Sequence, residues 1–284
     1  KNVIDKTDFE VLQPAIDYYE DNGTATDKLR TYYYQGCIYQ NMGNKTLAME
    51  SFVKAISEGC ESNDMLTMAR TYFAQGTIYF SLYEWDDYIE TNKNAAAYFK
   101  QAEKYNSYAN CLIRIINGYT LNDDAENALS YINECKQMLG VISDKRVADF
   151  YSAYLIYVTK YGTNQEIDSF INDYINIITD SFKDWLTLCN AYYKIGKYDD
   201  ALQATEQYRS HTDTSDELKY KALISMIYEK TDRYEESLRA YKEFMVLSDS
   251  TNLAIMRQDT KFVEERHSLE LQTLKERESK TRVI

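Results

Sequence analysis

A 40-residue spacing constrains this chain more than any other feature of its sequence. A tyrosine recurs at that interval three times, at Tyr39, Tyr79 and Tyr119, and the residues three positions before it are Gly36, Gly76 and Ile116. Such self-similarity predicts one structural unit used repeatedly. A chain built in this way usually works by presenting a surface, because each unit contacts only its neighbours.

Aligning segments that begin at residues 29, 69, 109, 182 and 218 extends the pattern. The eleventh position is always tyrosine, whereas the eighth and twentieth are mostly small. The eighth-position residues are Gly36, Gly76, Ile116, Cys189 and Ser225, and those at the twentieth are Ala48, Tyr88, Ala128, Ala201 and Ser237. Small residues at both positions let two helices approach closely, so each unit is predicted to be a helix hairpin. Tyr88 is the exception to the small residue at the twentieth position.

The turn into the second helix of the unit also recurs. It reads Trp85-Asp86-Asp87, Tyr198-Asp199-Asp200 and Tyr234-Glu235-Glu236. Acidic residues at a helix start suit the free N–H groups and the positive end of the helix dipole. With one proline and nine glycines in 284 residues and no strand alternation, the sequence predicts an all-α fold.

These features together resemble the tetratricopeptide repeat. The phrase GKYDDAL, from Gly196 to Leu202, is the strongest match, and Trp185 and Leu188 fit the fourth and seventh positions of that unit. The resemblance covers residues 29 to about 245, with a degenerate unit near 147–176, although the units run at 40 or 36 residues rather than 34. It implies a right-handed superhelical solenoid of antiparallel helix hairpins with a long C-terminal helix.

Three regions follow from this alignment. Residues 1–28 are predicted to form an N-terminal capping helix, in which Pro14 implies a kink or a later start. Residues 29–250 are predicted to be the solenoid, with about six hairpins. Residues 251–284 are predicted to be a long charged helix or connector, because they lack the repeat signature and end on Val283-Ile284.

The arrangement is also similar to the extracytoplasmic repeat domain of bacterial membrane-bound sensor and transcriptional regulators. The phrases that carry this likeness are residues 33–43 and residues 261–267. It implies a periplasmic location, a membrane next to the C-terminus, a role in signal transduction and possible self-association through the C-terminal helix. The alternative is a soluble cytoplasmic adaptor or co-chaperone, which the odd number of cysteines, five, slightly favours.

Several kinds of chemistry find no support in the sequence. The net charge of −13 argues against nucleic-acid binding, which needs a basic face. There is no phosphate loop, no GxSxG elbow and no zinc spacing, and His211 and His267 belong to no recognisable catalytic set. We therefore expect no enzyme activity, no cofactor and no metal, and we expect buried thiols rather than disulfides.

The expected binding surface is the concave groove. In the family that this chain resembles, positions two, five, nine and twelve of each first helix face that groove, which implies a peptide- or protein-binding site. The candidates are Arg30, Tyr33, Arg70, Phe73, Phe80, Asn117, Lys183, Asn190 and Tyr193, together with Arg114. Cationic and aromatic residues suit an extended segment with some acidic character, and an asparagine can hold a peptide backbone. The alternative is that these side chains only solvate and stiffen the helices.

Overall fold

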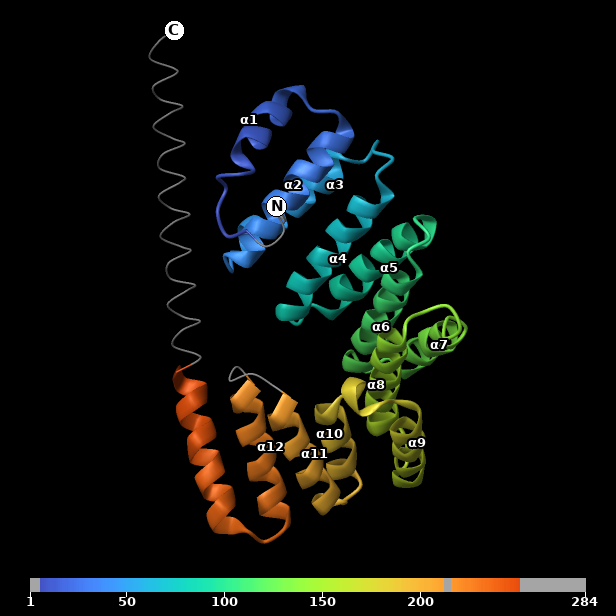
Figure 1. Cartoon of the computed structure of the whole chain (residues 1–284), viewed down its shortest axis with the longest axis vertical. Helices are drawn as coiled ribbons and strands as arrows, with labels where there is room; N and C mark the ends of the chain where they lie inside the picture. The colour runs from blue at the N-terminus through green and yellow to red at the C-terminus, as the bar shows by residue number, and fades with distance from the viewer. Residues whose placement is uncertain (1–5, 212–215, 251–284) are drawn as a thin grey trace. The chain divides into compact units, whose positions relative to one another are not determined.

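The structure, a computed structural model, describes residues 6–211 and 216–250, and in them it is all-α without a strand (Figure 1). The predicted charged C-terminal segment, residues 251–284, lies outside the described residues. The helices are α1 (Gln13–Asn22), α2 (Ala25–Asn41), α3 (Lys45–Glu58), α4 (Met65–Ser81), α5 (Trp85–Gln101), α6 (Tyr105–Leu121), α7 (Ala125–Lys136), α8 (Asp144–Tyr161), α9 (Asn164–Ile177), a short 3-10 helix (Asp180–Phe182), α10 (Trp185–Lys194), α11 (Tyr198–His211), α12 (Glu217–Lys230) and a helix over residues 234–250.

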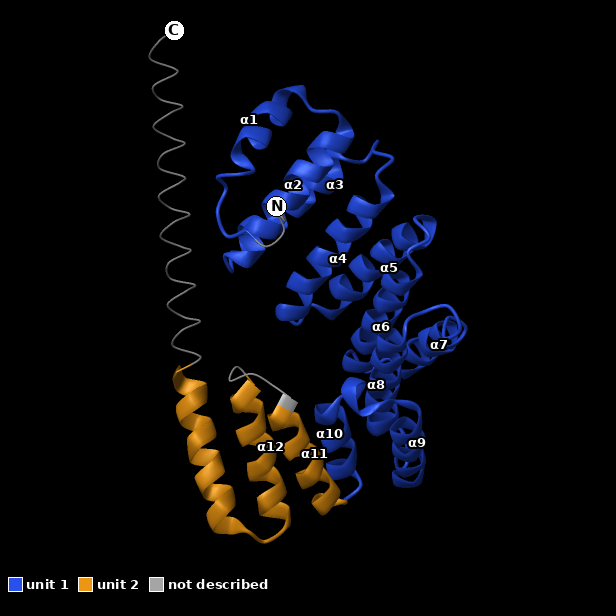
Figure 2. Cartoon of the chain, in the orientation of Figure 1, with its two compact units in different colours: residues 1–196 blue, residues 197–284 orange. Residues whose placement is uncertain are grey.

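The chain divides into two compact units, residues 1–196 and 197–284, which Figure 2 colours separately. Unit 1 holds α1 to α10. The described part of unit 2 holds α11, α12 and the helix over residues 234–250. The boundaries predicted after residues 28 and 250 stay predictions.

Unit 1 is built from helix hairpins, as the repeat predicts. The pairs α2 with α3, α4 with α5, α6 with α7 and α8 with α9 pack along one another, and each pair is joined by a short turn that reverses the chain. The first helices of successive hairpins also contact one another at α2 with α4, at α6 with α8 and at α8 with α10. The degenerate segment near residues 147–176 is therefore a regular hairpin, α8 and α9.

The small residues lie where the helices of a hairpin approach most closely. A Cβ atom added to Gly36 would lie 2.5 Å from Cδ1 of Phe52, and one added to Gly76 would lie 2.7 Å from Nδ2 of Asn92. Phe52 and Asn92 are fully buried. Glycine at these two positions therefore lets a large side chain of the second helix pack directly on the backbone of the first.

The first helices of the five aligned units share one ending. Each stops at the thirteenth position, and the residue at position fifteen has a positive φ: Gly43, Tyr83, Asp123, Gly196 and Asp232. The carbonyl of the eleventh-position tyrosine accepts the N–H five residues later in four of the units, at N···O distances of 2.8 to 3.1 Å. This bond pattern closes the helix and needs a left-handed residue, so the repeat conserves a turn geometry that glycine fills without strain but Tyr83 does not.

Side-chain caps set the helix starts. Asn44 and Asp124 accept hydrogen bonds from the backbone N–H groups of Leu47 and Asn127, at 3.0 Å each. The acidic pair after Trp85 lies in the first turn of α5, as predicted. At the N-terminus, Pro14 lies in the first turn of α1, which confirms the later start.

The cysteines are all free thiols. Cys37, Cys111, Cys135 and Cys189 are buried, as the sequence predicts, while Cys60 is exposed. Burial raises the pKa of the Cys37 thiol to about 11, and it raises the pKa values of Cys111 and Cys135 to about 12. These four thiols therefore serve as small apolar core residues.

Candidate functional site

A pocket of about 280 Å³ opens in unit 1 where α4, the end of α5 and the start of α6 meet. Its apolar wall comes from Phe73 on α4 and Phe99 on α5, whose ring centroids lie 6.3 Å apart at 75°. The remaining lining residues are Leu66, Arg70, Lys104, Ser107 and Asn110. The pocket therefore combines an aromatic wall with hydrogen-bonding groups and two cations.

The two cations of this pocket have no acidic partner among the described residues. Arg70 and Lys104 are both exposed, and neither forms an ion pair within the described residues. The hydroxyl of Ser107 and the amide of Asn110 likewise form no side-chain hydrogen bond within the part of the chain that the structure describes. On a chain with a net charge of −13, this is a local positive site with donors that remain available.

Arg114 supports the pocket from α6. Its Nη1 donates to the carbonyl oxygen of Phe73 at 2.9 Å and to Oδ1 of Asn92 at 3.3 Å, while Nη2 donates to Oγ1 of Thr77 at 2.7 Å. The guanidinium carbon also lies 3.8 Å from the centre of the Phe73 ring. Burial lowers the pKa of Arg114, but an arginine stays charged at physiological pH.

These contacts give Arg114 a structural role. A single planar group joins α4, α5 and α6 and fixes the ring of Phe73 against the pocket, and no carboxylate among the described residues neutralises it. The positive charge of Arg114 therefore adds to that of Arg70 and Lys104 without being the group most open to a ligand.

A second hollow lies in unit 2. Between α12 and the helix over residues 234–250 runs an apolar groove of about 510 Å³, with Met226, Tyr234, Leu238 and Tyr241 among its lining residues. The twenty-fourth repeat position shows why it is open. Four earlier units bury the residue there completely, at Phe52, Asn92, Ile132 and Thr205, whereas Tyr241 is 50% exposed. The described part of unit 2 therefore ends on an uncovered apolar face.

Two other properties bear on function. None of the helices in the described ranges is long and apolar enough to cross a membrane. Within the same ranges, His, Cys, Asp and Glu side chains form no group of three that could hold a metal ion.

Comparison with known proteins identifies the fold through structure alone. No family model and no curated protein matches the sequence. A tetratricopeptide repeat protein from Parabacteroides merdae ATCC 43184 is similar in structure, with a TM-score of 0.60 and 12% identity over 84% of this chain and 91% of the other. The chain has a tetratricopeptide-repeat-like fold.

Two further structures share this fold. A Rap protein, solved in complex with Competence and Sporulation Factor, has a TM-score of 0.52 and 16% identity over 83% of this chain and 79% of the other. BtubC from P. vanneervenii has a TM-score of 0.50 and 11% identity over 85% of this chain and 88% of the other. At these identities the likeness concerns the fold.

The tetratricopeptide-repeat-like fold brings some of the predicted groove residues together. Arg70 and Phe73 line the α4–α6 pocket, and Arg114 packs on Phe73. Sequence reasoning missed Lys104, because it lies in the turn before α6 rather than on a first helix, outside the positions that the family pattern assigns to the groove.

The other predicted residues lie elsewhere. Arg30 is exposed but is paired with Asp64, at 2.6 Å from Nε to Oδ2. Tyr33 lies in a core cluster with Cys37 and Phe52, and burial raises the pKa of its hydroxyl. Tyr33 therefore presents little of its ring to a ligand.

The later candidates are spread over separate places. Phe80 is 45% exposed beside the rings of Trp85 and Tyr88. Lys183 lies in the turn before α10, not on a first helix, and its Nζ is 2.6 Å from Oδ1 of Asp180.

The two asparagines that were expected to hold a peptide backbone differ in access. Asn190 is exposed on α10, with the half-buried Tyr193 one turn on. Asn117 is half-buried on α6, and its Oδ1 is buried without a hydrogen-bond partner among the described atoms. Binding through these residues stays a prediction.

Proposed function

We propose that this chain is a non-enzymatic scaffold that binds an extended peptide or protein segment, and that the α4–α6 pocket holds an acidic part of that segment. One observation carries the proposal. Arg70 and Lys104 lie beside the Phe73–Phe99 wall of a strongly acidic chain, and neither forms an ion pair in the part of the chain that the structure describes. Elsewhere the exposed Arg30, at the same repeat position as Arg70, has its charge matched by Asp64.

The shape and chemistry of the pocket suit a peptide. An aromatic wall offers area for an apolar side chain, and Ser107 and Asn110 can bond a peptide backbone. The two cations favour a carboxylate on the ligand. Such an exposed charge pair contributes more to selectivity than to affinity. The Rap structure that shares this fold contains a bound factor, which agrees with a binding role for such a scaffold.

A peptide titration tests this proposal. The probe is an extended acidic peptide with alternating Asp and Phe, labelled with a fluorophore and followed by anisotropy, beside a version in which Asn replaces Asp. We expect Arg70→Gln to weaken binding of the acidic probe about three- to tenfold and to leave the Asn version nearly unchanged. Arg30→Gln is the matched control, because it removes the same charge from the same repeat position where a carboxylate already neutralises it. Equal losses from the two variants would show a general charge effect and refute the pocket.

We further propose that the scaffold is the periplasmic sensing domain of a membrane-anchored bacterial regulator. The support is the sequence likeness of residues 33–43 and 261–267 to such domains, together with a binding pocket that could report a ligand. The rival is a cytoplasmic adaptor, which five free cysteines favour.

Protease treatment of spheroplasts decides between the two. The protein is expressed from its full-length gene and detected with an antibody against unit 1. Digestion in intact spheroplasts supports the periplasmic domain. Protection until the cells are lysed supports the adaptor and ends the sensor proposal.

A further inference from the structure

A second pocket in unit 1 has the opposite chemistry to the α4–α6 pocket. It lies between α8 and α9 and measures about 370 Å³. Three tyrosines of α8, Tyr154, Tyr157 and Tyr161, come at intervals of three and four residues, so they share one helix face. Phe170 of α9 completes the aromatic wall.

The rings form a continuous series. The centroid of Tyr154 lies 4.5 Å from that of Phe170 at 68° and 6.3 Å from that of Tyr157, and Tyr157 lies 5.0 Å from Tyr161. All three tyrosines are half-buried, which leaves part of each ring open to the pocket. Aromatic faces carry negative electrostatic potential, so a wall of this kind attracts cations.

Two carboxylates from α9 stand beside this wall. Glu166 and Asp173 lie seven residues apart, on the helix face that also carries Phe170. Oε2 of Glu166 accepts hydrogen bonds from the backbone and hydroxyl of Thr163, which lowers the pKa of Glu166 and keeps it ionised. Asp173 is exposed and makes no hydrogen bond or ion pair within the described residues.

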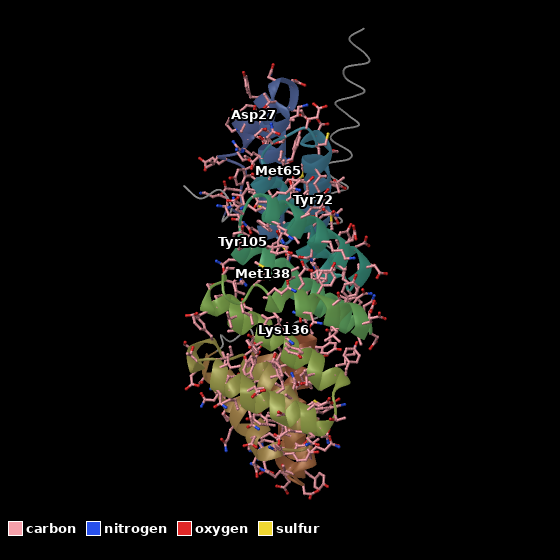
Figure 3. All side chains as sticks on the ribbon, turned by 90° about the vertical axis from the view of Figure 1, so that its right-hand side faces the viewer. Asp27, Met65, Tyr72, Tyr105, Lys136 and Met138 are labelled. Carbon is pink, nitrogen blue, oxygen red and sulfur yellow. The ribbon has the colours of Figure 1, made fainter. Side chains whose placement is uncertain are left out.

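A cation already uses the outer edge of the wall. Nζ of Lys136, which Figure 3 labels, lies 4.6 Å from the centre of the Tyr154 ring and 3.4 Å from its hydroxyl. Lys160 lies 5.5 Å from the Tyr161 ring but is held by Asp123, at 2.6 Å. The middle of the wall is different: no lysine or arginine of the described residues forms a cation–π contact with Tyr157 or an ion pair with Asp173.

We propose that the α8–α9 pocket binds an organic cation, either a quaternary ammonium group or the side chain of a lysine or arginine on a partner. The cation lies over Tyr157, with its apolar shell against Phe170 and its charge facing Asp173. This site goes beyond the acidic-segment pocket, from which it differs in helices, residues and sign of charge. An apolar ligand alone would leave the exposed carboxylate of Asp173 without a partner, and an anion would be repelled by Asp173 and Glu166.

The test compares ligands that differ only in charge. Choline and its neutral isostere 3,3-dimethyl-1-butanol are titrated into the chain at constant ionic strength, and tyrosine NMR shifts are followed. A short peptide with one lysine is compared in the same way with its glutamine version. We expect the charged member of at least one pair to bind about tenfold or more tightly than its neutral match. Choline binding alone identifies a small ammonium ligand, and lysine-peptide binding alone identifies a partner side chain. Equal binding within both pairs, or no binding at all, overturns the proposal.

Variants locate the site. Tyr157→Leu and Asp173→Asn should each weaken the preferred cation about fivefold or more, and Tyr157→Phe should retain binding because the ring remains. Tyr18→Leu is the matched control, since it makes the same exchange at an exposed tyrosine outside the pocket. Arg70→Gln should not affect the cation, which separates this site from the α4–α6 pocket. A loss of cation binding in Tyr157→Phe equal to that in Tyr157→Leu, or an equal loss in Tyr18→Leu, would refute the site.

Discussion

Replacing Gly36 with alanine tests the reading of the repeat most directly. In an exposed helix interior, alanine is about 1 kcal/mol more favourable than glycine. Here the new Cβ would lie 2.5 Å from Cδ1 of Phe52, about 1 Å inside normal carbon contact. Overpacking of this kind costs roughly 1–3 kcal/mol, and because Phe52 is fully buried, the upper part of that range applies. We therefore expect a net loss of about 1–2 kcal/mol in the free energy of unfolding.

The assay is urea unfolding followed by circular dichroism, with hydrogen exchange of the α2 amides to localise the effect. Local measurement is needed because a repeat chain with two units need not unfold in a single step. Gly140→Ala is the control, because a Cβ there would meet nothing within 4 Å. Adding Phe52→Leu to Gly36→Ala should recover part of the loss, since the smaller side chain relieves the overlap. A Gly36→Ala variant as stable as the original chain would refute the close approach of α2 and α3.

Three further outcomes follow from the structure. Tyr83→Gly should raise the stability by about 0.5–1 kcal/mol, because glycine adopts positive φ without strain, whereas Tyr18→Gly, inside α1, should lower it; thermal unfolding measures both. Arg114→Lys should cost about 1–2 kcal/mol in urea, because one ammonium cannot reach all three oxygen acceptors, and an unchanged midpoint would contradict that role. Burial raises the pKa of the Cys111 and Cys135 thiols to about 12 in the folded chain, whereas a thiol of the unfolded chain has a pKa near 9. Their contribution is therefore complete below pH 9 and declines above it by about 1.4 kcal/mol per pH unit for each thiol, a slope that Cys111→Ala should reduce in urea midpoints measured from pH 9 to 11.

The fold could be predicted from the sequence because it depends on local periodicity. The small eighth and twentieth positions and the acidic second-helix starts reflect local structure within one hairpin, and the tyrosine at the eleventh position, which recurs in all five aligned units, sets their register. Tyr88, the large residue at a small position, was visible as an exception. It is accommodated because Gly118, on the neighbouring α6, leaves room for its ring.

The site was predicted only in part, because it depends on contacts between hairpins. The family pattern found Arg70 and Phe73, but not Lys104, which enters the pocket from a turn. It also placed Tyr33 in the groove, whereas Tyr33 is buried in a core cluster with Phe52 and Cys37, contacts that the repeat alignment does not show. The α8–α9 pocket lies in the unit whose signature is degenerate, so alignment to the repeat could not have found it.

The uneven exposure of the thiols offers an experimental handle. A maleimide dye added to the native chain should attach at Cys60 and spare the other four, since those are buried and burial also raises the pKa of Cys37, Cys111 and Cys135. The four buried cysteines lie on α2, α6, α7 and α10. The rate at which each one is labelled therefore reports how often its own helix opens. Mass spectrometry of labelled fragments would then report the order in which unit 1 comes apart, without any engineered probe.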